Sequence, residues 1–453
     1  MPVAQDVIRH AAERPSKLAA CGPGGELTYA ELAGKISGAA RHLLRRGIGP
    51  GTIVALALAD PVELLAAVLA ADLAGATPLI GDHTWDRRRW SQVTAPVGPM
   101  AFVGRPLPYA AGAPVRREPR PEDPAWACFS SGSTGRPRAI VRRRASWTAS
   151  FPHLSDLAGI GPDDVVLVPG PLVSSLYAFA AVHALAAGAT AVVPGRWPAR
   201  RSLAAHLAGA TVVHLVPHRL PDVVGRSGSS LRAAVVGGAA LAPGTREEAG
   251  RAGLHVLAYY GATELSFVAV DVDGDGLRPF PGVEIEVRPE AGSSFGEVWV
   301  RSPWLADGYL GDAAGPLRRD RDGWVTVGDV AQPYRPGEVL RVRGRGDGAI
   351  QTGGATVVPE DVEEVLRKVP GVGDVVVVGS PHPSLGAVVT AVVEGAPPRA
   401  LLEATARTGL DAAQRPRRWY GVPSLPRTAT GKPARALVAA RLADGDPGIR
   451  RLT

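Results

Sequence analysis

The sequence FSSGSTGRPR, residues 129–138, is the stretch on which the interpretation of the whole chain depends. It places three serines, one threonine and two glycines in the six positions 130–135, and apolar residues lead in over 125–129 and out over 139–141. This pattern predicts a strand, a loop and a second strand. Glycines allow a tight loop whose amides approach a ligand closely, and hydroxyls with nearby arginines suit a polyphosphate. Taken alone, the same composition is more typical of a solvated hairpin turn.

A Walker-type phosphate loop is excluded at both places where one could occur. That motif needs Gly-Lys followed by Ser or Thr at the start of a helix. Gly135 is followed by Arg136, and the pair Gly431-Lys432 is followed by Pro433. If residues 130–135 bind phosphates, they therefore do so in another architecture.

Length and cysteine content limit the class of protein. With 453 residues the chain is too long for one compact core, so at least two domains are expected. The two cysteines, Cys21 and Cys128, form no metal-ligand or disulfide pattern, which fits a reducing compartment. Residues 1–16 include Asp6 and Glu13 and lack an apolar core, so no signal peptide is expected. These features together predict a cytoplasmic protein.

Charge and hydropathy argue against two kinds of partner. The net charge is +7, but 43 acidic residues are interspersed among the basic ones and no nucleic-acid motif occurs, so no nucleic-acid partner is expected. The arginine runs would suit small anionic ligands such as nucleotides. The apolar region 165–194 is interrupted by prolines and glycines, so no membrane span is expected.

The first half of the chain alternates short apolar runs with helical patterns. Thr28 and Glu31 form a capping-box pattern at the start of a helix that reaches residue 47. Further helices are expected at 61–73, 146–158, 175–187 and 201–207, and strands at 52–58, 164–168, 189–194, 210–216 and 232–237. Such alternation predicts a parallel sheet covered on both faces. Residues 80–124, rich in Pro and Arg and poorly periodic, are expected to be irregular surface.

The pattern of expected elements changes twice in the second half of the chain. Residues 254–345 contain several strand patterns with little helix, and RGRGDG at 343–348 then predicts a hinge or linker. Beyond it, helices are expected at 359–369, 399–408 and 434–443, with strands at 374–379 and 387–394. This pattern predicts a separate small α+β domain.

Four further stretches have the residue types of a nucleotide site. GGAAL at 237–241 ends a strand with small residues, against which a flat ring can lie, although a plain strand-end turn has the same composition. YGATE at 260–264 brings an aromatic ring, a hydroxyl and a carboxylate together. A carboxylate near a phosphate loop usually holds a divalent cation, but an exposed strand end is the simpler alternative.

The other two stretches lie later in the chain. DGWVTVGD at 322–329 ends in Asp329, and a carboxylate at a strand terminus can accept hydrogen bonds from ribose hydroxyls. PRTATGKPAR at 426–435 displays Lys432, one of only four lysines in an arginine-rich chain. Arginine does not replace lysine at a point contact, which favours a specific role for Lys432. An exposed basic loop is the alternative.

In this order and spacing, the motifs resemble those of the adenylate-forming superfamily of acyl-CoA synthetases, carrier-protein adenylation domains and luciferases. FSSGSTGRPR is similar to the family's phosphate loop SSGSTGxPK, YGATE to its YGxTE pattern, and TVGD to its TGD pattern. GRGD with IQTGGATVVPEDVE is similar to the hinge and following loop, and PRTATGKPAR to the C-terminal lysine loop. The resemblance covers essentially the whole chain, and YYGATELSFVAV looks most like the acyl- and aryl-CoA ligase branches.

The resemblance implies a fold and a set of ATP contacts. The fold is α/β: a large N-terminal domain of stacked αβ sheets plus a β-rich subdomain, residues 1–345, hinged to a small, mobile α+β C-terminal domain, residues 346–453. The implied phosphate-binding residues are Ser130, Ser131, Gly132, Ser133, Thr134, Gly135 and Arg138, the last standing where the family usually has Lys. Those implied around adenine are Tyr260, Gly261, Gly238, Ala239 and Ala240, and those at the ribose are Asp329 and Arg345.

The resemblance also implies catalytic roles. Thr263 would contact phosphate, Glu264 would hold Mg²⁺, and Lys432 would bridge the acid's carboxylate and ATP. Asp347 would be the hinge about which the C-terminal domain swings. Gly353 and Gly354 would line the path of the pantetheine thiol.

The acid pocket is expected to include Ser174, His214, Gly237 and Tyr259. Its many small residues hint at room for a bulky or long acid. The family's PLxH segment reads PLVS at 171–174 here, so the usual gating side chain is missing and Tyr177 is either a substitute or part of the core. His214 is either a polar contact to the substrate or a core histidine with its own partners.

The implied activity is ATP-dependent activation of a carboxylic acid to an acyl-adenylate, followed by transfer to the thiol of CoA, with ATP, Mg²⁺ and CoA required. The alternative is a stand-alone adenylation enzyme that loads a phosphopantetheinyl carrier protein. A nucleotide-binding protein without turnover is disfavoured because the implied site residues Glu264, Asp329, Asp347 and Lys432 are all present.

Overall fold

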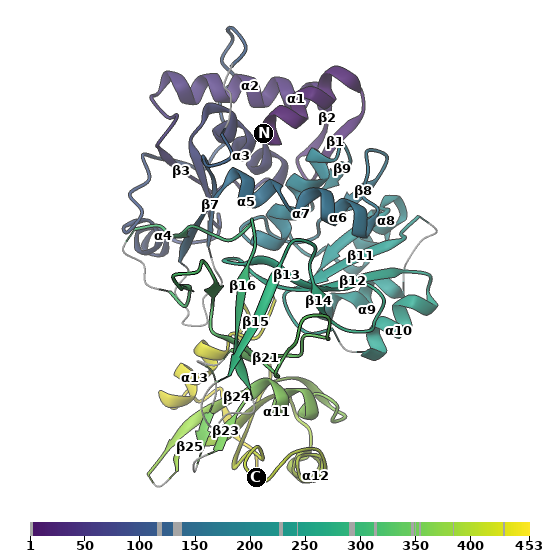
Figure 1. Ribbon diagram of the computed structural model, residues 1–453, viewed down its shortest axis with the longest axis vertical. Coiled ribbons are helices and arrows are strands. Elements are labelled where there is room, and N and C mark those ends of the chain that lie inside the picture. The colour runs from purple at the N-terminus through teal and green to yellow at the C-terminus, as the bar shows by residue number, and fades with distance from the viewer. Residues whose placement is uncertain are drawn as a thin grey trace. The chain divides into compact units, whose positions relative to one another are not determined.

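The computed structural model describes residues 3–115, 120–129, 138–225, 230–241, 243–289, 295–311, 315–345, 348, 350–352, 355–383, 385–428 and 431–453 (Figure 1). The predicted phosphate-loop residues Ser130–Gly135, the hinge residue Asp347 and the pair Gly353-Gly354 lie outside these ranges.

Two compact units make up the chain. The first comprises Met1–Ser130, Pro137–Glu284 and Val300–Leu317; the second comprises Ser131–Arg136, Ile285–Trp299 and Arg318–Thr453. The predicted boundary after residue 345 separates a mobile C-terminal lid from the rest of the chain. The two units are defined by packing and not by motion, so this boundary stays a prediction.

The first unit contains a large mixed sheet. Over the described residues it has nine strands in the order β14-β13-β12-β11-β10-β8-β9-β1-β2. The strands are β1 (Leu18–Gly22), β2 (Gly25–Thr28), β8 (Val165–Leu167), β9 (Thr190–Val192), β10 (Val212–Leu215), β11 (Ala233–Gly237), β12 (His255–Ala262), β13 (Ser266–Asp271) and β14 (Arg278–Pro279). Strands β1, β9, β8, β10, β11 and β12 pair in parallel, which confirms the parallel sheet expected from the alternating apolar runs.

A second sheet of the same unit carries the strands that flank FSSGSTGRPR. Its order is β17-β7-β6-β4-β3-β5, from β3 (Ile53–Leu56), β4 (Thr77–Ile80), β5 (Ala101–Val103), β6 (Pro124–Phe129), β7 (Ala139–Arg143) and β17 (Gly308–Tyr309). Strands β6 and β7 are antiparallel, with Phe129 opposite Ala139. The two predicted strands around the loop are therefore confirmed.

The expectation of irregular surface over residues 80–124 was wrong. Helix α4 (Arg87–Thr94) and strand β5 lie within it, and β6 begins at its end. The Asp86 carboxylate caps α4 by accepting a hydrogen bond from the Arg89 amide at 2.7 Å. Helix α4 has three arginines in eight residues and β5 has only three residues, so neither gives a clear apolar periodicity.

The helices of the first unit include every predicted one, with one break, and four that were not predicted from the sequence, at Val3–Glu13, Arg87–Thr94, Leu220–Val224 and Pro243–Arg251. They are α1 (Val3–Glu13), α2 (Tyr29–Arg45), α3 (Pro61–Ala74), α5 (Arg144–Thr148), α6 (Phe151–Ala158), α7 (Ser175–Ala186), α8 (Arg200–Gly209), α9 (Leu220–Val224) and α10 (Pro243–Arg251). The capping box at Thr28 and Glu31 is confirmed by reciprocal hydrogen bonds. The helix expected over 146–158 is divided into α5 and α6, with Pro152 in the first turn of α6.

Helix α3 is buried along almost its whole length. It contacts β1 of the first sheet and β3 and β4 of the second, so apolar residues are needed on every side of it. The one acidic residue of its last turns, Asp72, pairs with Arg144 at 2.6 Å, and both side chains are 4% exposed. This ion pair therefore lies inside the core of the first unit.

We expect Asp72→Ala to lower the free energy of unfolding of the first unit by about 3–5 kcal/mol, because it leaves a buried guanidinium without its carboxylate. Urea denaturation followed by tryptophan fluorescence would measure the change. The matched control is Asp163→Ala, which breaks a 2.9 Å pair with Arg14 at the surface and should leave the midpoint almost unchanged. Equal midpoints for the two variants would contradict the stabilising role of the buried pair.

The second unit contains two further sheets. One has the order β18-β19-β16-β20-β21, with β15 paired to β16; its strands are β15 (Glu284–Pro289), β16 (Gly296–Arg301), β18 (Arg318–Arg319), β19 (Val325–Thr326), β20 (Asp329–Ala331) and β21 (Val342–Arg345). The other has the order β23-β22-β25-β26-β27, with β24 paired to β25; its strands are β22 (Ile350–Thr352), β23 (Ala355–Val357), β24 (Val372–His382), β25 (Gly386–Gly395), β26 (Arg418–Val422) and β27 (Arg450–Arg451).

Helices cover both faces of this last sheet, as Figure 1 shows around β24. They are α11 (Pro359–Leu366), α12 (Arg399–Gly409) and α13 (Arg435–Ala443). The consecutive valines of β24 alternate between faces: Val375 and Val377 pack with α11 and α12, whereas Val376 and Val378 pack with α13. The helices and strands predicted beyond the hinge are confirmed. No helix in the described ranges has the length and apolar character needed to cross a membrane.

Candidate active site

The YGATE motif lies at the carboxyl end of β12 and in the turn that follows it. The Thr263 hydroxyl is 3.0 Å from the hydroxyl of Ser175, the first residue of α7. Glu264 is only 3% exposed, so the alternative of an exposed strand end is wrong for this carboxylate. Ligands of open α/β sheets bind at the carboxyl ends of the parallel strands. The motif is therefore at the edge where a nucleotide site is expected.

Two hydrogen bonds hold Glu264. Its side-chain Oε1 accepts a hydrogen bond from the Tyr309 hydroxyl at 2.9 Å, and its carbonyl accepts one from the Ala306 amide at 2.8 Å. Burial, together with the neighbouring Glu264 carboxylate, raises the pKa of the Tyr309 hydroxyl, which therefore stays protonated and donates at neutral pH. Sequence reasoning missed Tyr309, because nothing in its two-residue strand marks it as a partner of a glutamate 45 residues away.

The small residues at the end of β11 do receive a flat ring, but it is a ring of the protein itself. A Cβ at Gly237 would lie 2.1 Å from Cζ of Tyr259, which is the cross-strand neighbour of Gly237 in β12. Two of the predicted acid-pocket residues are therefore in direct contact. Ala239 and Ala240 are exposed and Tyr260 is half-buried.

The other predicted acid-pocket residues surround α7. Ser174 is the N-cap residue of α7 and is 8% exposed. His214, on β10, is 2% exposed, and its Nε2 has no hydrogen-bond partner among the described residues. Burial and the nearby His183 lower the pKa of His214 to about 3, so it is neutral. Tyr177 is 4% exposed with its ring against Gly170, which supports a core role.

The two residues implied at the ribose are neighbours in the second unit. Asp329 is the first residue of β20 and lies opposite Arg345 of β21 in the antiparallel register. Asp329 is 8% exposed. These residues are 16 positions apart in sequence, and the strand pairing brings them to one place.

Lys432 lies in a tight hairpin before α13. The Thr428 amide donates to the Lys432 carbonyl at 2.7 Å, and the Gly431 amide donates to the Thr428 carbonyl at 2.9 Å. Farther out, the Ala434 amide donates to the Pro426 carbonyl at 2.7 Å. The backbone around Lys432 is therefore fixed by its own turn.

Two arginines anchor this hairpin to the rest of the second unit. Arg427 pairs with Asp374 at 3.1 Å and with Glu394 at 3.2 Å, and it also donates to the Gly431 carbonyl at 3.1 Å. On the other side of Lys432, Arg435 pairs with Glu360 and with the buried Glu363, the latter at 2.7 Å. Each arginine thus binds two carboxylates. Arg427 precedes Lys432 in the sequence and Arg435 follows it, so the hairpin is anchored on both sides.

On the role that the resemblance implies for Lys432, we expect Arg427→Gln to lower the rate of acyl-adenylate formation about tenfold, because small displacements of a catalytic group are costly. The rate at which thioester forms from supplied acyl-adenylate and the thiol should change little. The matched control is Arg399→Gln, which breaks a 2.8 Å pair with Glu403 on α12. Stopped-flow or quenched-flow assays of each half-reaction would measure the effect, and equal adenylation by both variants would contradict a positioning role.

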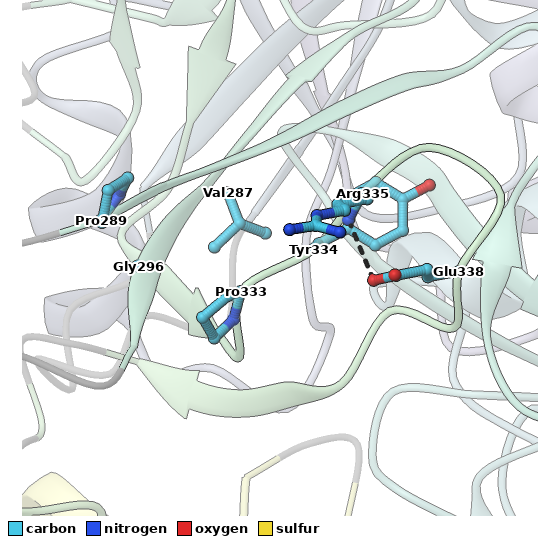
Figure 2. Close-up of a pocket in the computed structure, with 7 residues that line it drawn as sticks. All are labelled: Val287, Pro289, Gly296, Pro333, Tyr334, Arg335 and Glu338. Carbon is cyan, nitrogen blue, oxygen red and sulfur yellow. Dashed lines mark hydrogen bonds between the residues drawn. The ribbon is translucent and has the colours of Figure 1, made fainter.

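A separate cavity of about 400 Å³ lies in the second unit, where β15, β16 and the segment 333–338 meet. Figure 2 shows its lining residues, Val287, Pro289, Gly296, Pro333, Tyr334, Arg335 and Glu338. The Arg335 amide donates to the Glu338 carboxylate at 3.3 Å. No predicted site residue lines this cavity, and no role in the reaction is assigned to it.

The structure has a hydroxyl and a buried carboxylate at the carboxyl edge of a parallel sheet in an α/β protein, and comparison with known proteins identifies the family. Residues 7–110 and 104–310 match the AMP-binding enzyme family, and residues 361–432 match the AMP-binding enzyme C-terminal domain. The chain therefore belongs to the AMP-binding enzyme family, in the branch of AMP-forming acyl- and aryl-CoA synthetases.

Individual relatives agree. The uncharacterized acyl-CoA ligase YhfT of Bacillus subtilis (strain 168) is 32% identical over 70% of this chain and 68% of its own length. The indoleacetate–CoA ligase of Aromatoleum aromaticum is 28% identical over 87% of this chain and 88% of its own length.

Solved structures share the fold. The o-succinylbenzoate CoA synthetase MenE of Bacillus subtilis, in complex with the acyl-adenylate intermediate OSB-AMP, has a TM-score of 0.86 at 20% identity, over 97% of this chain and 98% of that one. MenE in complex with ATP and a magnesium ion has a TM-score of 0.84 at 21% identity, over 95% and 98%. This likeness confirms the predicted large N-terminal and small C-terminal domain architecture.

Proposed function

We propose that this protein uses ATP and Mg²⁺ to convert a carboxylic acid to its acyl-adenylate and then transfers the acyl group to the thiol of CoA. The observation that supports this proposal most strongly is the half-buried Thr263 and the buried Glu264 just after β12, bonded to Ser175 and Tyr309 respectively, in a chain of the AMP-binding enzyme family. Relatives named as CoA ligases support CoA as the acceptor.

Glu264 fits the needs of Mg²⁺ at a nucleotide site. Within the described ranges, no three or more His, Cys, Asp or Glu side chains come together as a metal site. Mg²⁺ usually takes one or two protein carboxylates and completes its octahedron with phosphate oxygens and water. A single held carboxylate is therefore sufficient, and the bound ion would neutralise charge on the polyphosphate.

In the proposed first step, a carboxylate oxygen of the acid attacks the α-phosphorus of ATP and pyrophosphate leaves. Ser130–Gly135 and Arg138 would bind the phosphates, with Thr263 beside them. Tyr260, with Gly261 and Gly238–Ala240, would bind adenine, and Asp329 with Arg345 would bind the ribose. The Lys432 ammonium would stabilise the charge that develops on the oxygens between acid and phosphorus.

In the proposed second step, the thiol gives up its proton to the solvent and its sulfur attacks the acyl carbonyl carbon. The bond from that carbon to the phosphate oxygen breaks, and AMP leaves. Asp347 would be the hinge that allows the C-terminal lid, residues 346–453, to change position between the steps. Gly353 and Gly354 would leave room for the thin pantetheine arm.

Product analysis by mass spectrometry would test the proposal. Purified protein would be incubated with ATP, Mg²⁺ and a panel of fatty, aryl and branched acids, with CoA, with a phosphopantetheinyl carrier protein, or with neither. Acyl-CoA together with AMP is the expected product, and the acid that yields it identifies the substrate class. Adenylate that reacts with the carrier protein and not with CoA would contradict CoA as the acceptor.

A further inference from the structure

The contact between Tyr309 and Glu264 has no role in the function proposed above. Glu264 would be a ligand of Mg²⁺, and a carboxylate that binds a metal well has its orientation fixed by other groups. In this chain the fixing group is the Tyr309 hydroxyl, 2.9 Å from Oε1 of a glutamate that is 3% exposed.

The segment that carries Tyr309 connects Glu264 to the strand that leaves the predicted phosphate loop. Tyr309 pairs with Ile140 of β7, and the Leu310 amide donates to the Ala139 carbonyl at 2.8 Å. Three residues earlier, the Ala306 amide donates to the Glu264 carbonyl at 2.8 Å. Residues 306–310 therefore hold the main chain and the side chain of Glu264 and are themselves held by β7.

Packing fixes the position of the Tyr309 ring. It lies against Gly315, where a Cβ would come 2.1 Å from Cζ of the ring, and the Leu317 amide approaches the hydroxyl oxygen at 3.4 Å. A residue with any side chain at position 315 would have to displace the ring. The hydroxyl is thus placed by the ring's packing as well as by its own hydrogen bonds.

We propose that Tyr309 is a positioning residue that acts through Glu264 and presents its carboxylate to the magnesium ion bound with ATP. The proposal rests on the assignment of Glu264 as the magnesium ligand. It predicts that loss of the hydroxyl weakens the magnesium-dependent part of ATP binding and leaves the metal-independent part unchanged.

The test is calorimetric titration of ATP into wild-type protein and Tyr309→Phe, once with Mg²⁺ and once with a chelator. We expect Tyr309→Phe to lose about tenfold in affinity for ATP in the presence of Mg²⁺, as is typical when the partner of a metal ligand is removed. With the chelator, the two proteins should bind ATP equally. Because phenylalanine keeps the ring on Gly315, the variant should stay folded, which a thermal melt of each protein would check.

Two further variants sharpen the comparison. Gly315→Ala leaves the hydroxyl intact but displaces the ring, so it should reproduce the loss seen in Tyr309→Phe. Tyr109→Phe removes a hydroxyl from a side chain that is 68% exposed and should bind ATP like wild type.

An ATP affinity that responds to Mg²⁺ equally in wild type and Tyr309→Phe would overturn the proposal, and so would a wild-type affinity that does not respond to Mg²⁺ at all. Failure of the proposed ligase function would show itself differently. The wild type would then yield no acid-dependent AMP, while the binding comparison would still report on Tyr309.

Discussion

Replacing Lys432 with alanine is expected to lower the rate of acyl-adenylate formation by about a hundredfold or more, the loss that follows removal of one preorganised group facing developing charge. The ammonium is carried by a hairpin whose backbone is bonded at Thr428 and whose sides are anchored by Arg427 and Arg435. Such a loop presents a charge at a fixed place, so little reorganisation is needed when the reaction occurs.

The measurement is single-turnover adenylation with pyrophosphate release as the readout, followed by thioester formation from supplied acyl-adenylate. The second rate should fall much less than the first. Lys368→Ala is the matched control, because Lys368 is a lysine of the same unit that pairs with Glu364 at the surface at 3.6 Å. Adenylation by Lys432→Ala at the rate of this control would refute the assigned role. Lys432→Arg should also be impaired, because a planar guanidinium does not replace a compact ammonium.

The second large effect is expected for Glu264→Gln. The glutamine has nearly the same shape, and its carbonyl oxygen can still accept the hydrogen bond from Tyr309, so the fold should be kept. What is lost is the negative charge offered to Mg²⁺, and with it about 3 kcal/mol of transition-state stabilisation, which is about a hundredfold in the rate of adenylation.

Magnesium titration of the adenylation rate distinguishes this cause from general damage. Glu264→Gln should need a much higher Mg²⁺ concentration for half its maximal rate. Glu284→Gln, which changes an exposed carboxylate bonded to Arg301 at 2.6 Å, should titrate like wild type. A Glu264→Gln variant with normal magnesium dependence would show that this carboxylate is not the ligand.

Local sequence signals predicted much of the fold. The Thr28–Glu31 capping box begins α2, and the valines 375–378 alternate between the two faces of β24, as a strand buried on both sides requires. Among the elements that were missed, α4 and α10 carry several charged residues and β5 has only three residues, so their apolar patterns are weak, whereas α1 and β4 were missed although they bury apolar residues. The break between α5 and α6 was missed because the apolar residues continue across it.

The sequence motifs identified the candidate site residues, whereas only the structure showed which residues contact them. Thr263, Glu264, Asp329 and Lys432 were predicted from the sequence, and the structure places Asp329 opposite Arg345. The groups that hold these residues were not predicted. Tyr309 is 45 residues from Glu264, and Arg427 is 53 residues from Asp374, so no local pattern connects either pair. The tertiary fold alone brings them together.

The most direct test of the proposed reaction follows an oxygen atom. The acid that proves active would be supplied with its carboxylate labelled by a heavy oxygen isotope, together with ATP, Mg²⁺ and CoA, and the AMP would be analysed by mass spectrometry. Attack of the carboxylate on the α-phosphorus, followed by cleavage of the acyl carbon–oxygen bond, predicts AMP that carries one labelled oxygen. Thioester formed with unlabelled AMP, or with ADP in its place, would contradict an acyl-adenylate intermediate.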